Sequence, residues 1–137
     1  MRTHLCYGLA LVLLVGVNGC GGGGPEGIIK DKNATTKEIA GILEGIKDDA
    51  SADAAMPKLD KACEKLGDLN KKFFEINISM EEMGKLLQKN SAESTEASQK
   101  LKTATESAQK AAPGKTAQIT AALAKSVAMP KLNLPAK

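Results

Sequence analysis

Apolar residues recur at alternating three- and four-residue intervals along one stretch of the chain, and this repeat constrains the fold more than any other feature. The repeat runs from Ala52 to Ile76, with lysines and acidic residues between the apolar positions. The apolar positions are Ala52, Ala55, Leu59, Ala62, Leu66, Leu69, Phe73 and Ile76. Such alternation is the seam along which one helix packs against another. The sequence therefore predicts a long helix that needs a partner of similar length.

A second stretch with the same repeat begins at Met80. Just before it, an Asn-Ile pair breaks the first repeat, and Ser79 with Glu82 has the spacing of a capping box. The second seam consists of Met80, Met83, Leu87, Asn90, Ser94, Ala97, Leu101, Ala104 and Ala108. A helix from Met80 to about Ala112 is predicted, ended by the Pro-Gly pair that follows.

The two seams match in one register if the second helix folds back on the first. The facing pairs would be Ile76–Met80, Phe73–Met83, Leu69–Leu87, Leu66–Asn90, Ala62–Ser94, Leu59–Ala97 and Ala55–Leu101. In that register Lys71 and Lys72 point outward. The expected fold class is all-α: an antiparallel helical hairpin, or a small three- to four-helix bundle after a flexible Gly-rich tether.

Shorter helices are expected on both sides of this pair. Thr35 and Glu38 have capping-box spacing, and a helix over Thr36–Lys47 follows from the apolar spacing after them. A further helix is expected over Thr116–Ala128. Its apolar stripe is Ile119, Ala122, Leu123 and Val127. Residues 35–128 are accordingly predicted to form one helical domain, and residues 129–137 an unstructured basic tail.

The amino-terminal segment has a different character. Arg2 and His4 precede the apolar run Gly8–Val17, which has the order of a secretory signal and is too short to span a bilayer. The run ends at Val17-Asn18-Gly19-Cys20. This sequence resembles the lipobox of bacterial lipoproteins, although Leu is commoner than Val at its first position and Asn18 is larger than the usual residue.

The resemblance implies a specific modification at Cys20. In that family the cysteine thiol is joined to a diacylglycerol, and a peptidase cuts before it, here between Gly19 and Cys20. Residues 1–19 would be removed as a signal peptide, and residues 20–34 would form a flexible Gly-rich tether. Gly21 lacks the acidic signal for inner-membrane retention, so in a Gram-negative cell the outer membrane is expected. An ordinary cleaved signal, with no role for Cys20, is the alternative.

Removal of residues 1–19 from the 137-residue chain would leave 118 residues of unusual composition. The only His, Arg and Tyr lie in the signal, Trp is absent, and Phe73 and Phe74 are the only aromatic residues left. Without His or Arg the mature chain lacks the usual general base, imidazole ligand and bidentate phosphate binder. Its 18 basic and 16 acidic residues nearly cancel. We therefore expect no enzyme, metal site, cofactor, small-molecule substrate or nucleic-acid partner.

Cys63 is the only thiol left once Cys20 is lipidated. It lies beside the first seam, so it is expected either to be buried as a small hydrophobe or to form an intermolecular disulfide. Asn90 and Ser94 interrupt the second seam with polar groups. They are expected to set the helix register, to bind a partner, or simply to be exposed.

These observations predict a lipid-anchored cell-envelope protein with a helical structural or protein-interaction module. Its expected partners are the membrane, through the lipid, and an envelope protein. One alternative is a secreted membrane-active protein that uses Lys100–Lys125 as an amphipathic surface helix. Another is a wall-linked structural lipoprotein, because the layout resembles that of murein lipoproteins, whose terminal lysine joins peptidoglycan; Lys137 would be that residue here.

Overall fold

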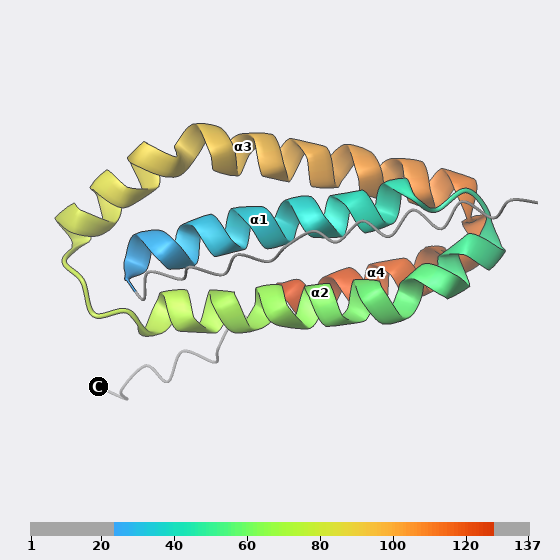
Figure 1. Cartoon of the computed structure of the whole chain (residues 1–137), viewed down its shortest axis with the longest axis horizontal. Coiled ribbons are helices and arrows are strands. Elements are labelled where there is room, and N and C mark those ends of the chain that lie inside the picture. The colour runs from blue at the N-terminus through green and yellow to red at the C-terminus, as the bar shows by residue number, and fades with distance from the viewer. Residues whose placement is uncertain (1–23, 128–137) are drawn as a thin grey trace, which may run out of the picture.

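The computed structural model describes residues 24–127, which form a small all-helical bundle. Its elements are α1 (Pro25–Glu44), α2 (Asp49–Glu75), α3 (Met80–Ala111), the 3-10 turn η1 (Pro113–Lys115) and α4 (Thr116–Ser126) (Figure 1). No strand occurs within residues 24–127. The predicted all-α bundle is thus confirmed, and both long helices begin and end within a few residues of the predicted positions.

Side-chain caps explain where α2 and α3 begin. The Asp48 carboxylate accepts a hydrogen bond from the backbone N–H of Ser51 at 2.7 Å, and the Ser51 hydroxyl accepts one from the backbone N–H of Asp48. The Ser79 hydroxyl accepts one from the N–H of Glu82, as the capping-box spacing predicts. Both boxes satisfy backbone donors that a helix start leaves unpaired.

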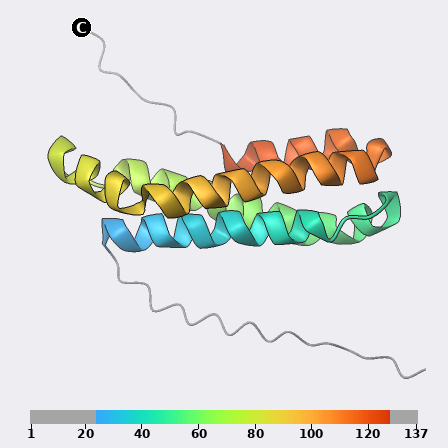
Figure 2. The same cartoon turned by 90° about the horizontal axis from the view of Figure 1, so that it is seen from above.

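The helix α1 lies between the two long helices. It packs against α2 on one side and α3 on the other, while α4 packs mainly against α2 (Figures 1 and 2). Chain direction alternates along the bundle, so α1 and α3 run one way and α2 and α4 the other. Since α2 and α3 occupy opposite positions across the bundle, they make almost no direct contact.

This arrangement corrects the predicted hairpin register. Leu59 and Ala97 are both buried, but α1 separates the helices that carry them. At the end of the predicted register, Leu87 is 51% exposed and Met80 is 89% exposed. The seam of α3 consists mostly of small or polar residues, which lets α1 approach closely and displace α2 as its neighbour. Only the outward direction of Lys71 and Lys72 holds.

The predicted tether is also wrong over most of its length, because α1 begins at Pro25. Proline suits the first helical position, and the positive end of the helix dipole stabilises the negative charge of Glu26 in the first turn. Ile29 and Asn33 are buried, so tertiary contacts hold this segment in a helix. Thr35, the expected cap, lies inside α1 with its side chain buried. Residues 20–23 lie outside the described part of the chain.

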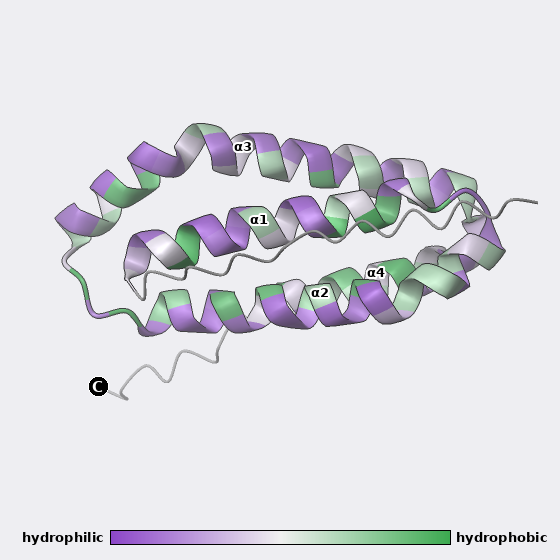
Figure 3. Ribbon diagram, in the orientation of Figure 1, coloured by the Kyte–Doolittle hydropathy of each residue, from purple (hydrophilic) through white to green (hydrophobic). Residues whose placement is uncertain are grey.

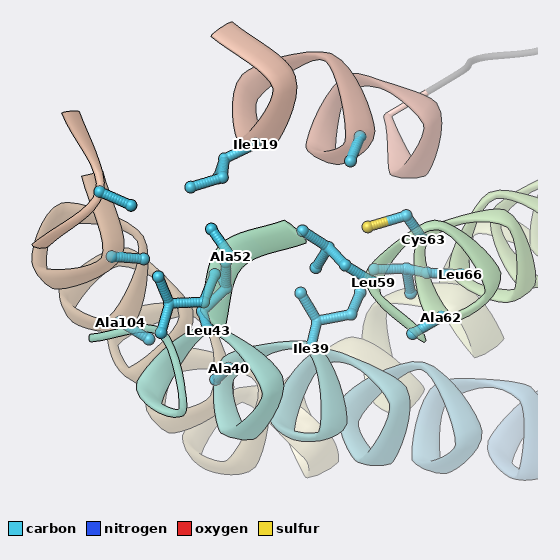
Figure 4. Close-up of a cluster of buried hydrophobic side chains, with 14 residues drawn as sticks. Ile39, Ala40, Leu43, Ala52, Leu59, Ala62, Cys63, Leu66, Ala104 and Ile119 are labelled. Atoms are coloured by element: carbon cyan, nitrogen blue, oxygen red, sulfur yellow. The ribbon is translucent and has the colours of Figure 1, made fainter. Parts of the chain in front are cut away.

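The core occupies the half of the bundle that contains α4, which we call the closed half (Figure 4). All four helices contribute side chains to it. It consists of Ile39, Ala40, Leu43, Ile46, Ala52, Leu59, Ala62, Cys63, Leu66, Ala104, Ala108, Ala112, Ile119 and Ala122. Its many alanines allow the helices to pack closely around a few large residues such as Ile39, Leu43 and Leu59.

The opposite half, where α2 passes into α3, we call the open half. Of residues 24–127, this half contains the first turns of α1, the last turns of α2 and the first half of α3 (Figure 1). Among the helices within residues 24–127, none is both long enough and apolar enough to cross a membrane.

Candidate functional site

A groove lies where α4 ends and the open half begins. It is lined by Lys32 and Thr36 of α1, Leu66, Asn70, Phe73 and Phe74 of α2, Ser98 and Leu101 of α3, and Ser126 and Val127 at the end of α4. Its volume is about 340 Å³. In the closed half α4 fills one position of the bundle. Past the end of α4, none of residues 24–127 fills the same position, and the groove lies there.

Two contacts with α2 fix the end of α4 at the edge of this groove. Gly67 lets the α4 backbone come so close that a Cβ placed there would lie 2.8 Å from the carbonyl oxygen of Lys125. One turn further, the Asn70 side-chain amide donates a hydrogen bond of 2.7 Å to the carbonyl oxygen of Ser126. These contacts give the groove a fixed end wall.

Lys32 brings one positive charge to the groove. Its amine lies 4.4 Å from the centre of the Phe73 ring, a cation–π contact. Burial lowers the pKa of this amine, because the charged form loses water. Within residues 24–127 Lys32 forms no ion pair. The groove thus combines apolar walls with a cation that an acidic group could neutralise.

A second surface lies at the tip of the open half, and we call it the apolar end. It consists of Phe74, Ile76, Ile78, Met80, Met83 and Leu87. Three of these are among the four exposed large hydrophobic side chains within residues 24–127. In Figure 3 the connection between α2 and α3 is green in two stretches, with a hydrophilic stretch between them. Exposed large apolar side chains gathered near one end of a domain make this surface a candidate for interaction.

Polar contacts between α1 and α3 set the position of the apolar end. The Ser94 hydroxyl donates a hydrogen bond of 3.0 Å to the Asn33 side-chain oxygen, and the Lys89 amine lies 3.0 Å from a carboxylate oxygen of Glu26. Asn90 is buried and donates to the carbonyl oxygen of Leu86 in its own helix. Ser94 therefore helps to fix the register of α3, one of its predicted roles, although its partner helix is α1.

Cys63 faces the core of the closed half and has no exposed surface. Burial is the main cause that raises the pKa of its thiol to about 11, and the nearby Asp60 carboxylate adds to the rise. The predicted burial is confirmed. An intermolecular disulfide through Cys63 would require α2 and α4 to separate.

The predicted sites at Gly19, Cys20 and Lys137 lie outside the described residues. Within residues 24–127 no group of His, Cys, Asp and Glu side chains is arranged to hold a metal ion. The stretch Lys100–Lys125, considered above as one amphipathic surface helix, is divided by η1. Its apolar residues belong to the core, so that interpretation is wrong for this structure.

No family model matches the chain, and neither a curated protein nor a solved structure matches it. The groove and the apolar end are surfaces that the sequence patterns did not predict. Lys32 fell in the expected tether, and Met80 and Leu87 were expected to face α2. The adjacent aromatic residues Phe73 and Phe74 were the one available signal, because only one of two neighbouring helical positions can face the core.

Proposed function

We propose that this protein is a lipid-anchored cell-envelope protein whose helical domain is a protein-interaction module without catalytic activity. The observation that carries the module is the groove beyond Val127, where a bundle position that α4 fills in one half is not filled by any of residues 24–127 in the other. The proposal of a lipid anchor is based on the lipobox-like sequence Val17–Cys20. The last residue of this sequence lies five positions before the first residue of α1.

The groove suits an amphipathic helix supplied by an envelope partner. In the closed half a helix of 11 residues occupies this position, and a helix with an apolar stripe is the element that would extend the same packing. The apolar walls offer Leu66, Phe73 and Leu101 to such a stripe. An Asp or Glu of the partner would pair with Lys32, which lines the groove and forms no ion pair within residues 24–127.

The lipid anchor is tested by acyl labelling. Wild-type protein expressed in a bacterial host should incorporate a clickable fatty acid, and Cys20→Ser should remain as an unlabelled precursor. Cys63→Ser is the matched control, because its thiol is buried and should not affect labelling. Processing without label in the wild type would contradict the anchor.

The groove is tested with a photo-crosslinking residue at Val127, which is exposed and lines the groove. We expect one envelope protein to be captured there and not at Glu106, an exposed control position on α3. The captured segment should have an apolar helical stripe. As a purified peptide it should bind the wild-type domain, and Lys32→Glu should weaken the binding by about tenfold or more.

Three results would contradict a groove for a partner helix. They are equal capture at Val127 and Glu106, capture of a second copy of this chain, and binding that Lys32→Glu leaves unchanged. Circular dichroism of Lys32→Glu should match the wild type, since the Lys32 side chain lies on the rim of the bundle rather than in its core.

A further inference from the structure

We propose that the apolar end is a membrane contact: Phe74, Met80 and Leu87 enter the lipid interface beside the anchor and hold the bundle against the bilayer. This inference rests on lipidation of Cys20 and names the surface that the anchor brings to the membrane. Its basis is a match between two lengths, both measured from the start of α1.

The first length is the reach of the chain from the anchor. Cys20 precedes Pro25 by five positions, so the two Cα atoms cannot be more than about 18 Å apart even in a fully extended chain. The bundle therefore remains close to the headgroups whatever conformation these residues adopt. Since α1 begins in the open half, this half lies nearest to the anchor (Figure 1).

The second length is the projection of α3 beyond α1. The ion pair between Lys89 and Glu26 places the first turn of α1 beside the third turn of α3. Met80 precedes Lys89 by nine positions, which corresponds to about 14 Å of helix. The tip of α3 thus extends about 14 Å beyond the start of α1. This is nearly the greatest distance, about 18 Å, that can separate Cys20 from the start of α1. With the anchor in the bilayer, the apolar end can reach the interface.

The side chains at the tip suit this contact. Met80 is 89% exposed, Phe74 54% and Leu87 51%, whereas Ile76, Ile78 and Met83 are half-buried. Exposed apolar side chains of this kind lower the free energy of a protein when they leave water for the interface.

Three amines near the tip are paired with carboxylates. The Lys85 amine lies 2.6 Å from the Glu81 carboxylate, and both Lys30 and Lys89 pair with Glu26. Because these amines already have acidic partners, we expect contact with uncharged phosphatidylcholine as well as with anionic lipid. The two surfaces share Phe74 but differ in charge, because the cation Lys32 in the groove has no such partner within residues 24–127.

The experiment uses the lipidated mature protein, reconstituted into phosphatidylcholine vesicles, with an environment-sensitive fluorophore on a single thiol. Cys63→Ala removes the buried thiol, and Met80→Cys places the fluorophore at the tip. Lys110→Cys is the matched control, because Lys110 is exposed on the last turn of the same helix, in the closed half. Flotation of the vesicles measures anchoring independently of the fluorophore.

We expect both labelled proteins to float with the vesicles. The probe at position 80 should show blue-shifted emission and be quenched by spin-labelled lipid several-fold more than the probe at position 110. Adding Leu87→Glu should reduce the quenching at position 80 without changing flotation or helix content.

Each other result overturns the inference. Flotation with equal, weak quenching at both positions would leave the anchor intact and remove the membrane contact. A blue-shifted probe at position 80 that lipid does not quench, with energy transfer between labelled copies, would assign the apolar end to a second copy of the chain. Failure to float would remove the anchor and the contact together.

Discussion

The two halves of the bundle differ in how they use apolar residues. In the closed half, Leu43, Leu59 and Ile119 have no exposed surface and are surrounded by alanines from neighbouring helices. In the open half, side chains as large as Phe74, Met80 and Leu87 are half exposed or more. The same helices α2 and α3 run through both halves, so the difference comes from what packs beside them.

The comparison indicates that α4 determines where the seams of the longer helices are covered. Where α4 is present, these seams are covered and contribute to the free energy of folding. Beyond its end, within residues 24–127, apolar side chains of the groove and the apolar end are exposed, and we propose that other molecules bind there. The predictions below test this division, beginning with the largest expected effect.

The reactivity of the Cys63 thiol measures how readily the closed half opens. Because it is buried, we expect alkylation of the native protein at pH 8 to be about a thousandfold or more slower than that of the unfolded chain, the ratio set by a stability of about 5 kcal/mol or more. The rate is measured with iodoacetamide and mass spectrometry, with Met80→Cys as the open control. Equal rates at positions 63 and 80 would show that the closed half opens readily.

The same thiol predicts a pH dependence. The folded protein keeps the Cys63 proton until the pH approaches the raised pKa of about 11, whereas the unfolded chain releases it near the ordinary value of 9.0. The unfolded state therefore binds fewer protons in this window, and the free energy of unfolding falls as the pH rises from 9 toward 11. Urea unfolding of wild type and Cys63→Ala should diverge in this window, with the wild type falling more steeply.

Truncation of a leucine side chain to alanine should lower the free energy of unfolding much more in the closed half than in the open half. Leu43→Ala removes a fully buried side chain, and we expect it to lower the free energy of unfolding by about 2–5 kcal/mol. Leu87→Ala in the open half should change it by only about 0.5 kcal/mol or less. Urea unfolding followed by circular dichroism measures both. Similar losses would mean that the open half is packed as tightly as the closed half.

Two glycines give a finer comparison. Ala at Gly67 would bring a Cβ within 2.8 Å of the Lys125 carbonyl oxygen, so α4 would have to shift, at a cost of about 1–3 kcal/mol. Gly84, in the open half of α3, has no such neighbour within 4 Å. Gly84→Ala should therefore stabilise the protein by about 0.5–1 kcal/mol through helix propensity. A stabilising Gly67→Ala would contradict the close approach of α4.

A further prediction concerns the capping box at the start of α3. Ser79→Ala removes the hydroxyl that caps Glu82, and we expect a loss of about 1 kcal/mol in thermal unfolding. Ser79→Asp retains a capping acceptor and should restore most of the loss. If Ser79→Asp remains as unstable as Ser79→Ala, capping is not the role of this side chain.

The residue patterns within each helix predicted well where α2, α3 and α4 begin and end. Matching the apolar seams of two helices did not predict which helices pack against each other. The apolar repeats located α2 and α3, and the capping boxes depend only on nearby residues, so both could be predicted locally. The hairpin register failed because two seams with the same repeat match each other whether or not a third helix intervenes. That helix, α1, was missed in its first half because Gly27 and the scattered polar residues there have little helical pattern of their own, and contacts with α3 hold it.

The groove and the apolar end were not predicted, because they too depend on how the helices pack against one another. The sequence predicted the extent of the helix Thr116–Ser126 to within two residues, but not that it packs against α2, so the groove could not be located before the bundle was assembled. Lys32 became relevant only when α1 placed it beside Phe73. The lipobox resemblance, by contrast, needs only four consecutive residues, so a lipid anchor can be proposed from the sequence alone, whereas the two surfaces could not.

Hydrogen exchange of the lipidated protein tests the division into two halves most directly. It would be measured by mass spectrometry on the protein anchored in vesicles and on a non-lipidated mature chain in solution. We predict slow exchange for Ile39–Leu43 and Leu59–Leu66 in both samples. Met80–Leu87 should exchange rapidly in solution and more slowly on vesicles. Equal protection of both halves in solution, or no change at Met80–Leu87 on vesicles, would contradict the account.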